Sequence, residues 1–142
     1  MSHGDQEHNK AAFVRFLEAV NSHDHDEIAR AVDEVCRPDL RFVTPMPLPV
    51  SGVEAIKQVW DKLLIAYPDV HVRMDEIIAD GDAFAVRNTV TATHLGEHLG
   101  IPPTGRTVTY GEMFFGKFLD GKLSEITGVV DIYGQLRQLQ AA

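Results

Sequence analysis

The stretch TVTYGEMFFGKFLDGKLSEITGVVDI, residues 107–132, decides the fold because alternating apolar residues flank an Asp-Gly pair on both sides. Asp-Gly between two such runs is a strong signal for a β-hairpin, since both residues tolerate the backbone conformation of a tight turn. With Asp120 and Gly121 as the central turn residues, Phe118 lies opposite Leu123. The stretch therefore predicts two long antiparallel strands.

Continuing this register along the hairpin places one set of side chains on a single face of the sheet. Phe114 lies opposite Thr127 and Tyr110 opposite Asp131, with Glu112 between the two pairs. We take this face as the concave one, so Tyr110, Glu112, Phe114 and Thr127 become candidate substrate contacts. A single β-bulge would shift every pairing beyond it.

Asp131 is a lone carboxylate in an otherwise apolar and β-branched run, EITGVVDIYG (125–134). Burial raises the pKa of an unpaired carboxylate toward neutrality, which suits a general acid or base. Aspartate is also a favoured N-cap, and a C-terminal helix is expected to begin at Tyr133, so Asp131 could instead be a cap with a lowered pKa. Both interpretations stay open, with Glu112 and Glu125 as reserve carboxylates at a solvated rim.

The strand predicted for residues 83–94, AFAVRNTVTATH, alternates in the same way. Its apolar positions should point inward, which makes Asn88 and His94 polar residues in an apolar wall. Each is a candidate catalytic residue, although a buried Asn or His that hydrogen-bonds to the backbone is the more ordinary case.

Helical periodicity and capping signals predict helices at about residues 8–21, 24–37 and 51–67. A capping-box pair, Ser51 and Glu54, should begin the third helix. Phe16 and Trp60 lie in the apolar stripes of the first and third helices, and both are candidate substrate contacts, although core packing is the commoner role. A short strand (39–44) and a proline-rich loop (45–50) separate the second and third helices.

With strands at 70–78, 83–94, 107–118 and 122–132, these helices predict an α+β fold in which helices pack into a curved, largely antiparallel sheet. At 142 residues we expect a single domain spanning 1–142.

The composition excludes several classes of function. A net charge of -8 argues against a nucleic-acid or anionic-membrane partner, either of which needs a clustered positive surface. The single cysteine, Cys36, falls within an expected helix and should be a buried thiol. No transmembrane or signal segment is evident, which predicts a cytoplasmic protein. The run HDHD (23–26) reads as a helix cap in a turn, and because nucleotide-binding motifs are also missing we expect no metal and no cofactor.

The chain resembles the SnoaL-like polyketide cyclases, which belong to the nuclear-transport-factor-2-like superfamily together with ketosteroid isomerases and limonene epoxide hydrolases. The stretches that carry the resemblance span nearly the whole chain and are NSHDHDEI, CRPDLRF, SGVEAIKQVW, AYPDVHV, IIADGDAFAVRN, THLGEHLGIPPTGRTV, LDGKLSEI and DIYGQLRQL. The resemblance implies a cone-shaped sheet wrapped around three N-terminal helices, a short C-terminal helix, a deep apolar pocket and a homodimer formed through the outer sheet face.

For mechanism, the resemblance implies that a carboxylate near the end of the last strand is the acid/base of an intramolecular aldol closure, a position that Asp131 fits. Thr127 stands where the family commonly has tryptophan, and Phe114 where aspartate is common. The expected function is a cofactor-independent acid/base enzyme, a polyketide (ester) cyclase or related isomerase, acting on a hydrophobic carbonyl-bearing molecule. An epoxide hydrolase or cofactor-free hydroxylase with the same pocket, and a non-catalytic binding or dimerisation module, remain the alternatives.

Overall fold

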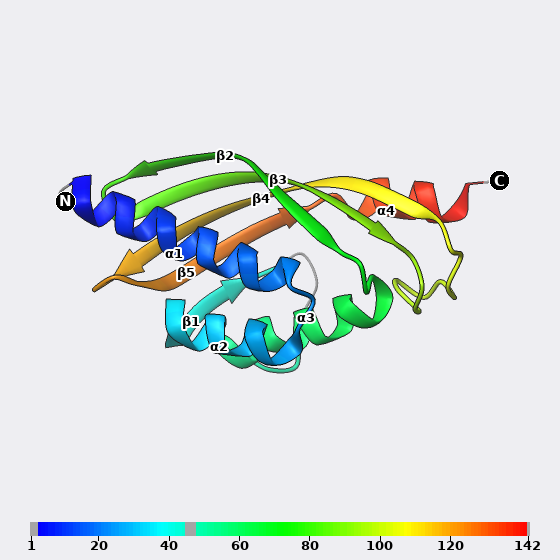
Figure 1. Ribbon diagram of the computed structural model, residues 1–142, viewed down its shortest axis with the longest axis horizontal. Coiled ribbons are helices and arrows are strands. Elements are labelled where there is room, and N and C mark those ends of the chain that lie inside the picture. The colour runs from blue at the N-terminus through cyan, green and yellow to red at the C-terminus, as the bar shows by residue number, and fades with distance from the viewer. Residues whose placement is uncertain (1–2, 45–47, 142) are drawn as a thin grey trace.

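Figure 1 shows the computed structural model of the chain, which describes residues 3–44 and 48–141. Its elements run in the order α1 (His3–Asn21), α2 (His25–Val35), β1 (Cys36–Val43), α3 (Gly52–Ala66), β2 (His71–Asp80), β3 (Ala83–Thr93), β4 (Thr107–Leu119), β5 (Lys122–Val130) and α4 (Ile132–Gln140). The α+β class is confirmed. Residues 45–47 of the predicted proline-rich loop lie outside the described residues. So do residues 1–2 and 142, at the two limits of the predicted domain.

The strands form one mixed sheet in the order β1-β5-β4-β3-β2. The parallel pair is β1 with β5, and the remaining pairs are antiparallel. The long strands β2 to β5 arch over α1, while α2 and α3 lie next to the edge strand β1, on the same side of the sheet as α1 (Figure 1). The apolar faces of the first three helices therefore pack against the concave face of the sheet, and the hydrophobic core lies between these two layers.

The second helix begins as predicted and ends earlier than predicted. Asp24 is its N-cap, and its side chain accepts hydrogen bonds from two backbone N–H groups of the first turn. The helix ends at Val35, because Pro38 disfavours helical geometry in the residue before it, and Cys36 already has extended backbone angles. The expectation that Cys36 lies within a helix is thus wrong, although its burial is confirmed.

The third helix starts at the expected place without the predicted capping box. Ser51 is the N-cap, but its side chain makes no capping hydrogen bond. The next residue, Gly52, has a φ of 66°, and a Cβ at this position would lie 2.9 Å from the carbonyl oxygen of Pro38. Glycine is therefore required where the chain turns into α3.

The β4–β5 hairpin follows the predicted register only for its first pairs. Phe118 lies opposite Leu123 as predicted, but the next pair is Lys117 with Glu125. Ser124 is therefore the extra residue of a β-bulge, and its hydroxyl donates a hydrogen bond to the Lys117 carbonyl oxygen at 3.0 Å. Every residue of β5 beyond Ser124 lies on the opposite face from the one that the sequence predicted.

Because of this bulge, the pairs beyond Ser124 differ from the predicted ones by one residue on β5. Phe114 lies opposite Gly128 instead of Thr127, and Glu112 lies opposite Val130. The Phe114 ring occupies the space above Gly128, where a Cβ would come within 2.3 Å of a ring carbon. Thr127 is exposed on the outer face.

By contrast, the alternation predicted for β3 is confirmed. Its buried residues include Phe84, Val86, Asn88, Val90 and Ala92. The turn that precedes β3 is shifted by one residue from the prediction, since Asp80 pairs with Ala83.

The outer face of the sheet carries a patch of large apolar side chains that are each at least half exposed. Its members are Ile78, Met113, Phe115 and Val129. They come from β2, β4 and β5, and they surround a shallow depression that Glu76 and Arg87 also line.

Candidate functional site

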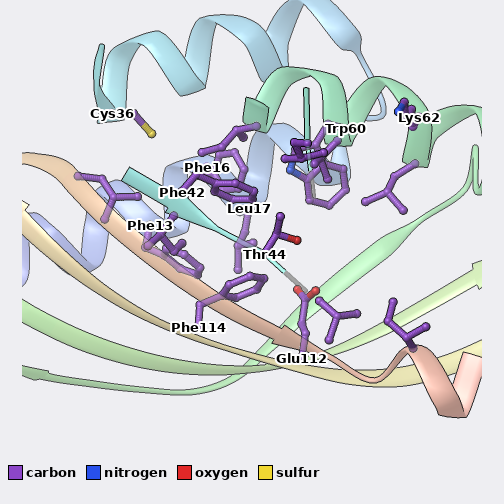
Figure 2. Close-up of a pocket in the computed structure, with 18 of the residues that line it drawn as sticks. Phe13, Phe16, Leu17, Cys36, Phe42, Thr44, Trp60, Lys62, Glu112 and Phe114 are labelled. Carbon is purple, nitrogen blue, oxygen red and sulfur yellow. The ribbon is translucent and has the colours of Figure 1, made fainter. Parts of the chain in front are cut away.

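A cavity of about 490 Å³ lies between the helices and the concave face of the sheet. Side chains of α1, α3, β1, β4 and β5 form its walls, and the β3–β4 loop and the start of α4 contribute at one end. Aliphatic and aromatic side chains make up most of the walls, and Figure 2 shows the rings of Phe13, Phe16, Phe42, Trp60 and Phe114. The volume and apolar lining are typical of a site for a small hydrophobic molecule.

Glu112 places a carboxylate in this apolar wall. It comes from β4, and Figure 2 shows its oxygens directed into the cavity, with Phe114 and Thr44 nearby. Burial raises its pKa to about 7, although a hydrogen bond from Asn88 acts in the opposite direction. A carboxyl group with this pKa exchanges its proton near neutral pH, as a general acid/base must.

Asn88 supports Glu112 from the neighbouring strand. The two residues are direct cross-strand partners, and the Asn88 Nδ2 atom donates a hydrogen bond to Glu112 Oε1 at 3.1 Å. Asn88 is 1% exposed and does not line the cavity, so the structure places it behind the carboxylate.

Tyr110 lines the cavity two residues before Glu112, on the same face of β4. Burial raises the pKa of its hydroxyl far above the ordinary value, and the negative charge of Glu112 and the neighbouring Tyr67 add to this effect. The Tyr110 hydroxyl therefore stays protonated at any physiological pH and is available as a hydrogen-bond donor.

Asp131 does not lie in the cavity, which corrects the prediction that it is buried beside Tyr110. It is exposed, and it is the N-cap of α4, where its Oδ1 atom accepts a hydrogen bond from the Gly134 N–H at 2.7 Å. The β-bulge at Ser124 is the physical reason, since it turns the end of β5 by one residue. Of the two interpretations that the sequence left open, the geometry matches the cap.

The cavity brings together five of the nine predicted site residues, namely Phe16, Trp60, Tyr110, Glu112 and Phe114. Thr127 and Asp131 lie elsewhere, because the bulge reverses the face of β5.

His94 is fully buried but does not line the cavity. Its Nδ1 atom accepts the Thr104 backbone N–H at 3.2 Å and lies 3.0 Å from the Thr104 hydroxyl, so the ring proton is on Nε2. Its backbone N–H and carbonyl bond to Arg106 and Gly105. These contacts fix the loop before β4, which is the ordinary structural role considered for this histidine.

Sequence reasoning missed a polar group at the end of the cavity nearest the β3–β4 loop. Gln135 of α4 and His98 of the loop both line the cavity, and Gln135 Oε1 accepts a 2.9 Å hydrogen bond from the Tyr67 hydroxyl and lies 3.3 Å from His98 Nε2. Burial lowers the pKa of His98, so its ring is neutral. His98 lies in a loop, which has no periodic pattern, and the short run GQLRQL does not show that Gln135 faces the cavity. The sequence therefore held no signal that could have placed these two residues.

The HDHD turn is used for packing and capping. Asp24 caps α2, His23 Nε2 donates to the Val70 carbonyl oxygen at 2.6 Å, and His25 Nδ1 lies 2.9 Å from Asp61 Oδ1. Within residues 3–44 and 48–141, no three His, Cys, Asp or Glu side chains converge as metal ligands would. Over the same residues, no helix has the length and apolarity needed to cross a bilayer.

Solved structures share this architecture. AclR from Streptomyces galilaeus, a proposed hydroxylase, is 30% identical with a TM-score of 0.80, and the match covers 94% of this chain and 82% of AclR. IdmH from Streptomyces antibioticus, a proposed polyketide cyclase, is 25% identical with a TM-score of 0.80 over 92% of this chain and 97% of IdmH. A proposed SnoaL-like polyketide cyclase from Jannaschia sp. CCS1 is 20% identical, with a TM-score of 0.86 over 96% and 94% of the two chains.

Among curated proteins, no sequence matches the chain. The family model for the SnoaL-like polyketide cyclases matches residues 11–139, which is nearly the whole chain and includes every residue of the cavity wall discussed above. The chain belongs to the SnoaL-like polyketide cyclase family.

Proposed function

We propose that this chain is a cofactor-independent acid/base enzyme that closes a ring in a hydrophobic polyketide by intramolecular aldol condensation, with Glu112 as the acid/base. The Glu112 carboxylate removes a proton α to a carbonyl. The resulting enolate carbon attacks a second carbonyl carbon of the same molecule, a carbon–carbon bond forms, and protonated Glu112 returns the proton to the new alkoxide. Tyr110 donates a hydrogen bond to the enolate oxygen, and the aromatic walls hold the substrate in a folded pose.

One observation carries this proposal: Glu112 is an acidic group in a largely apolar cavity, and its pKa is raised to about 7 by burial. The carboxylate is therefore shielded from water, and near neutral pH both its protonated and its ionised form are populated. Asn88 holds the carboxylate in place, and Tyr110 lies beside it on the same strand face.

A second candidate reaction is a hydroxylation without a cofactor. It is favoured by the match to AclR, which is named as a proposed hydroxylase and is 30% identical to this chain. The same cavity would serve, with Glu112 removing a proton from the substrate and the resulting carbanion adding to dioxygen, the co-substrate, to form a hydroperoxide. Conversion of this hydroperoxide to the alcohol needs an external two-electron reductant. A cavity that only binds ligand is the non-catalytic alternative, and it predicts no proton transfer.

The first step can be tested without knowing the natural substrate. Tetralin-2-one, a bicyclic aromatic ketone with acidic α-hydrogens, is incubated with the protein in D₂O, and loss of the α-hydrogen signals is followed by proton NMR. We expect exchange above the buffer rate, reduced about 100-fold or more in Glu112→Gln, since general base catalysis contributes about 10²- to 10⁴-fold. Tyr110→Phe should reduce the exchange rate by a smaller factor.

Asp131→Asn is the matched control, because asparagine is also a good N-cap and should preserve α4. We expect this variant to exchange at the wild-type rate. Full activity in Glu112→Gln together with loss of activity in Asp131→Asn would refute the assignment of Glu112 and restore Asp131 as the base. No exchange by the wild-type protein, with the ketone shown to bind, would favour the non-catalytic module.

We also propose that the apolar patch on the outer sheet face is covered by a second copy of this chain. The patch (Ile78, Met113, Phe115 and Val129) places four large apolar side chains, each at least half exposed, side by side on one sheet face, and contiguous exposed apolar side chains are typical of an interaction surface. Glu76 and Arg87 lie at the same depression and form an ion pair within the chain at 3.6 Å, so a second copy can pack its own patch against this one without burying an unpaired charge.

A further inference from the structure

The cavity has two chemically different ends. The inner end, defined here by Phe13, Leu17, Cys36, Phe118, Leu123 and Ile126, is lined by hydrocarbon and one sulfur. All six residues are at most 7% exposed. The Cys36 thiol has its pKa raised to about 12 by burial, so it stays a neutral, weak hydrogen-bonding group.

The outer end carries the polar groups. Tyr110, Glu112, His98 and Gln135 line it, and the exposed side chains of Lys62 and Glu97 lie at the same part of the wall. Ile65, which also lines the cavity, is 66% exposed and places the opening beside the second half of α3. The entrance and the reactive groups are thus at the same end.

The two ends are too far apart for one polar group to serve both. Along β4, Phe118 and Glu112 are separated by roughly 20 Å, at about 3.3 Å per residue. In Figure 2, Cys36 and Phe13 lie toward one side of the cavity and Glu112 lies toward the other. Asn9, the buried amide closest along α1, lies one turn before Phe13 and does not line the cavity.

We propose that the cavity binds its ligand in one direction, with an unoxygenated hydrocarbon portion at the inner end and the portion that carries the carbonyl groups, including both that react, beside Glu112. This inference rests on the proposed function and narrows its substrate class, because it disfavours molecules with oxygens at both ends. A ketone or hydroxyl at the inner end would lose its hydrogen bonds to water without forming a hydrogen bond to the protein, which weakens binding. A hydrocarbon at the same place strengthens binding, because burial of apolar surface is favourable. The same oxygen at the outer end meets the Tyr110 hydroxyl.

Three ketones of one chain length test the direction of binding: undecan-2-one, with one terminal ketone; undecane-2,10-dione, with a ketone near each end; and undecan-6-one, with a central ketone. Trp60 is the one tryptophan of the chain and lines the cavity, so its fluorescence reports occupancy, and calorimetry confirms the affinities. We expect undecan-2-one to bind about tenfold more tightly than the dione, the effect of one buried unpaired carbonyl. Undecan-6-one should lie between the two.

A variant that supplies a hydrogen-bond donor at the inner end should remove this preference. Leu17→Gln adds an amide there, and we expect it to bring the affinity for the dione to within about threefold of that for undecan-2-one. Val14→Gln makes the equivalent change on the exposed side of the same helix and should keep the tenfold preference. If Leu17→Gln does not fold, Cys36→Ser makes the smaller change at the same end.

The outcomes separate this inference from the proposed function. Equal affinity of the wild-type protein for undecan-2-one and the dione, or no binding of any of the three ketones, overturns the inference whatever the result of the deuterium-exchange assay. An unchanged preference in a folded inner-end variant overturns it as well. A protein that shows the preference but catalyses no exchange supports directional binding and refutes only the acid/base role of Glu112.

Discussion

Replacing Glu112 by glutamine should change how the stability of the protein depends on pH. The pKa of Glu112 is raised from 4.5 to about 7, chiefly by burial. Between these values the folded state holds a proton on Glu112 that the unfolded state has released. The folded state therefore binds more protons, and the free energy of unfolding falls as the pH rises through this range.

The size of the effect follows from the same values. One pH unit is worth about 1.4 kcal/mol, so full ionisation of Glu112 costs the folded protein about 3 kcal/mol. Glu112→Gln removes the ionisable group and keeps the shape and the contact with Asn88. We expect the variant to match the wild type near pH 4.5 and to be more stable by about 3 kcal/mol at pH 8.

Urea unfolding followed by Trp60 fluorescence, repeated from pH 4.5 to 9, measures this difference. Comparing variant with wild type cancels other titrating groups, including His98, whose lowered pKa makes stability rise with pH below about 6.5. Glu18→Gln, an exposed substitution on α1, is the control and should give a constant difference. If the free energy of unfolding of Glu112→Gln and of the wild type depended on pH in the same way, the raised pKa of Glu112 would be refuted.

Three further predictions follow from other contacts. Asn88→Leu removes the hydrogen bond that lowers the pKa of Glu112, so the midpoint of its carboxyl titration by ¹³C NMR should move upward, by about one pH unit; an unchanged midpoint would contradict the contact. Asp131→Ala should lower the free energy of unfolding by about 1 kcal/mol in urea titrations through loss of the α4 cap, whereas Asp131→Asn should not. Phe115→Lys should convert the proposed dimer to a monomer in light scattering, and a wild-type monomer at the same concentration would refute the dimer.

The order of elements could be predicted from the sequence because each signal is local. Apolar spacing on α1 and α3, the Asp24 cap and the two hairpin turns depend on residues within one or two turns of each other. The same holds for β3, where strict alternation correctly placed Asn88 and His94 inward.

The site was predicted less well, since it depends on register. Ser124 looks like any polar strand residue, and nothing in its neighbourhood marks it as the extra residue of a bulge. Because the side-chain period of a strand is two, that one residue reversed the predicted orientation of Thr127 and Asp131. The bulge did not affect residues that precede it in the chain, so the predicted orientation was correct for Tyr110, Glu112 and Phe114.

The bulge also explains why two acidic residues, Glu112 and Asp131, have opposite environments. Without Ser124 as an inserted residue, Asp131 would face the cavity in place of Val130, and a second carboxylate would lie beside Tyr110. Two carboxylates in one apolar wall would repel each other, and the charge of each would raise the pKa of the other. With the bulge, Asp131 reaches solvent and a backbone N–H, and Glu112 is left with a neutral amide as its hydrogen-bond partner. With the second carboxylate outside the cavity, the pKa of Glu112 is set chiefly by burial and by Asn88, so the β5 register and the proposed acid/base chemistry depend on the same inserted residue.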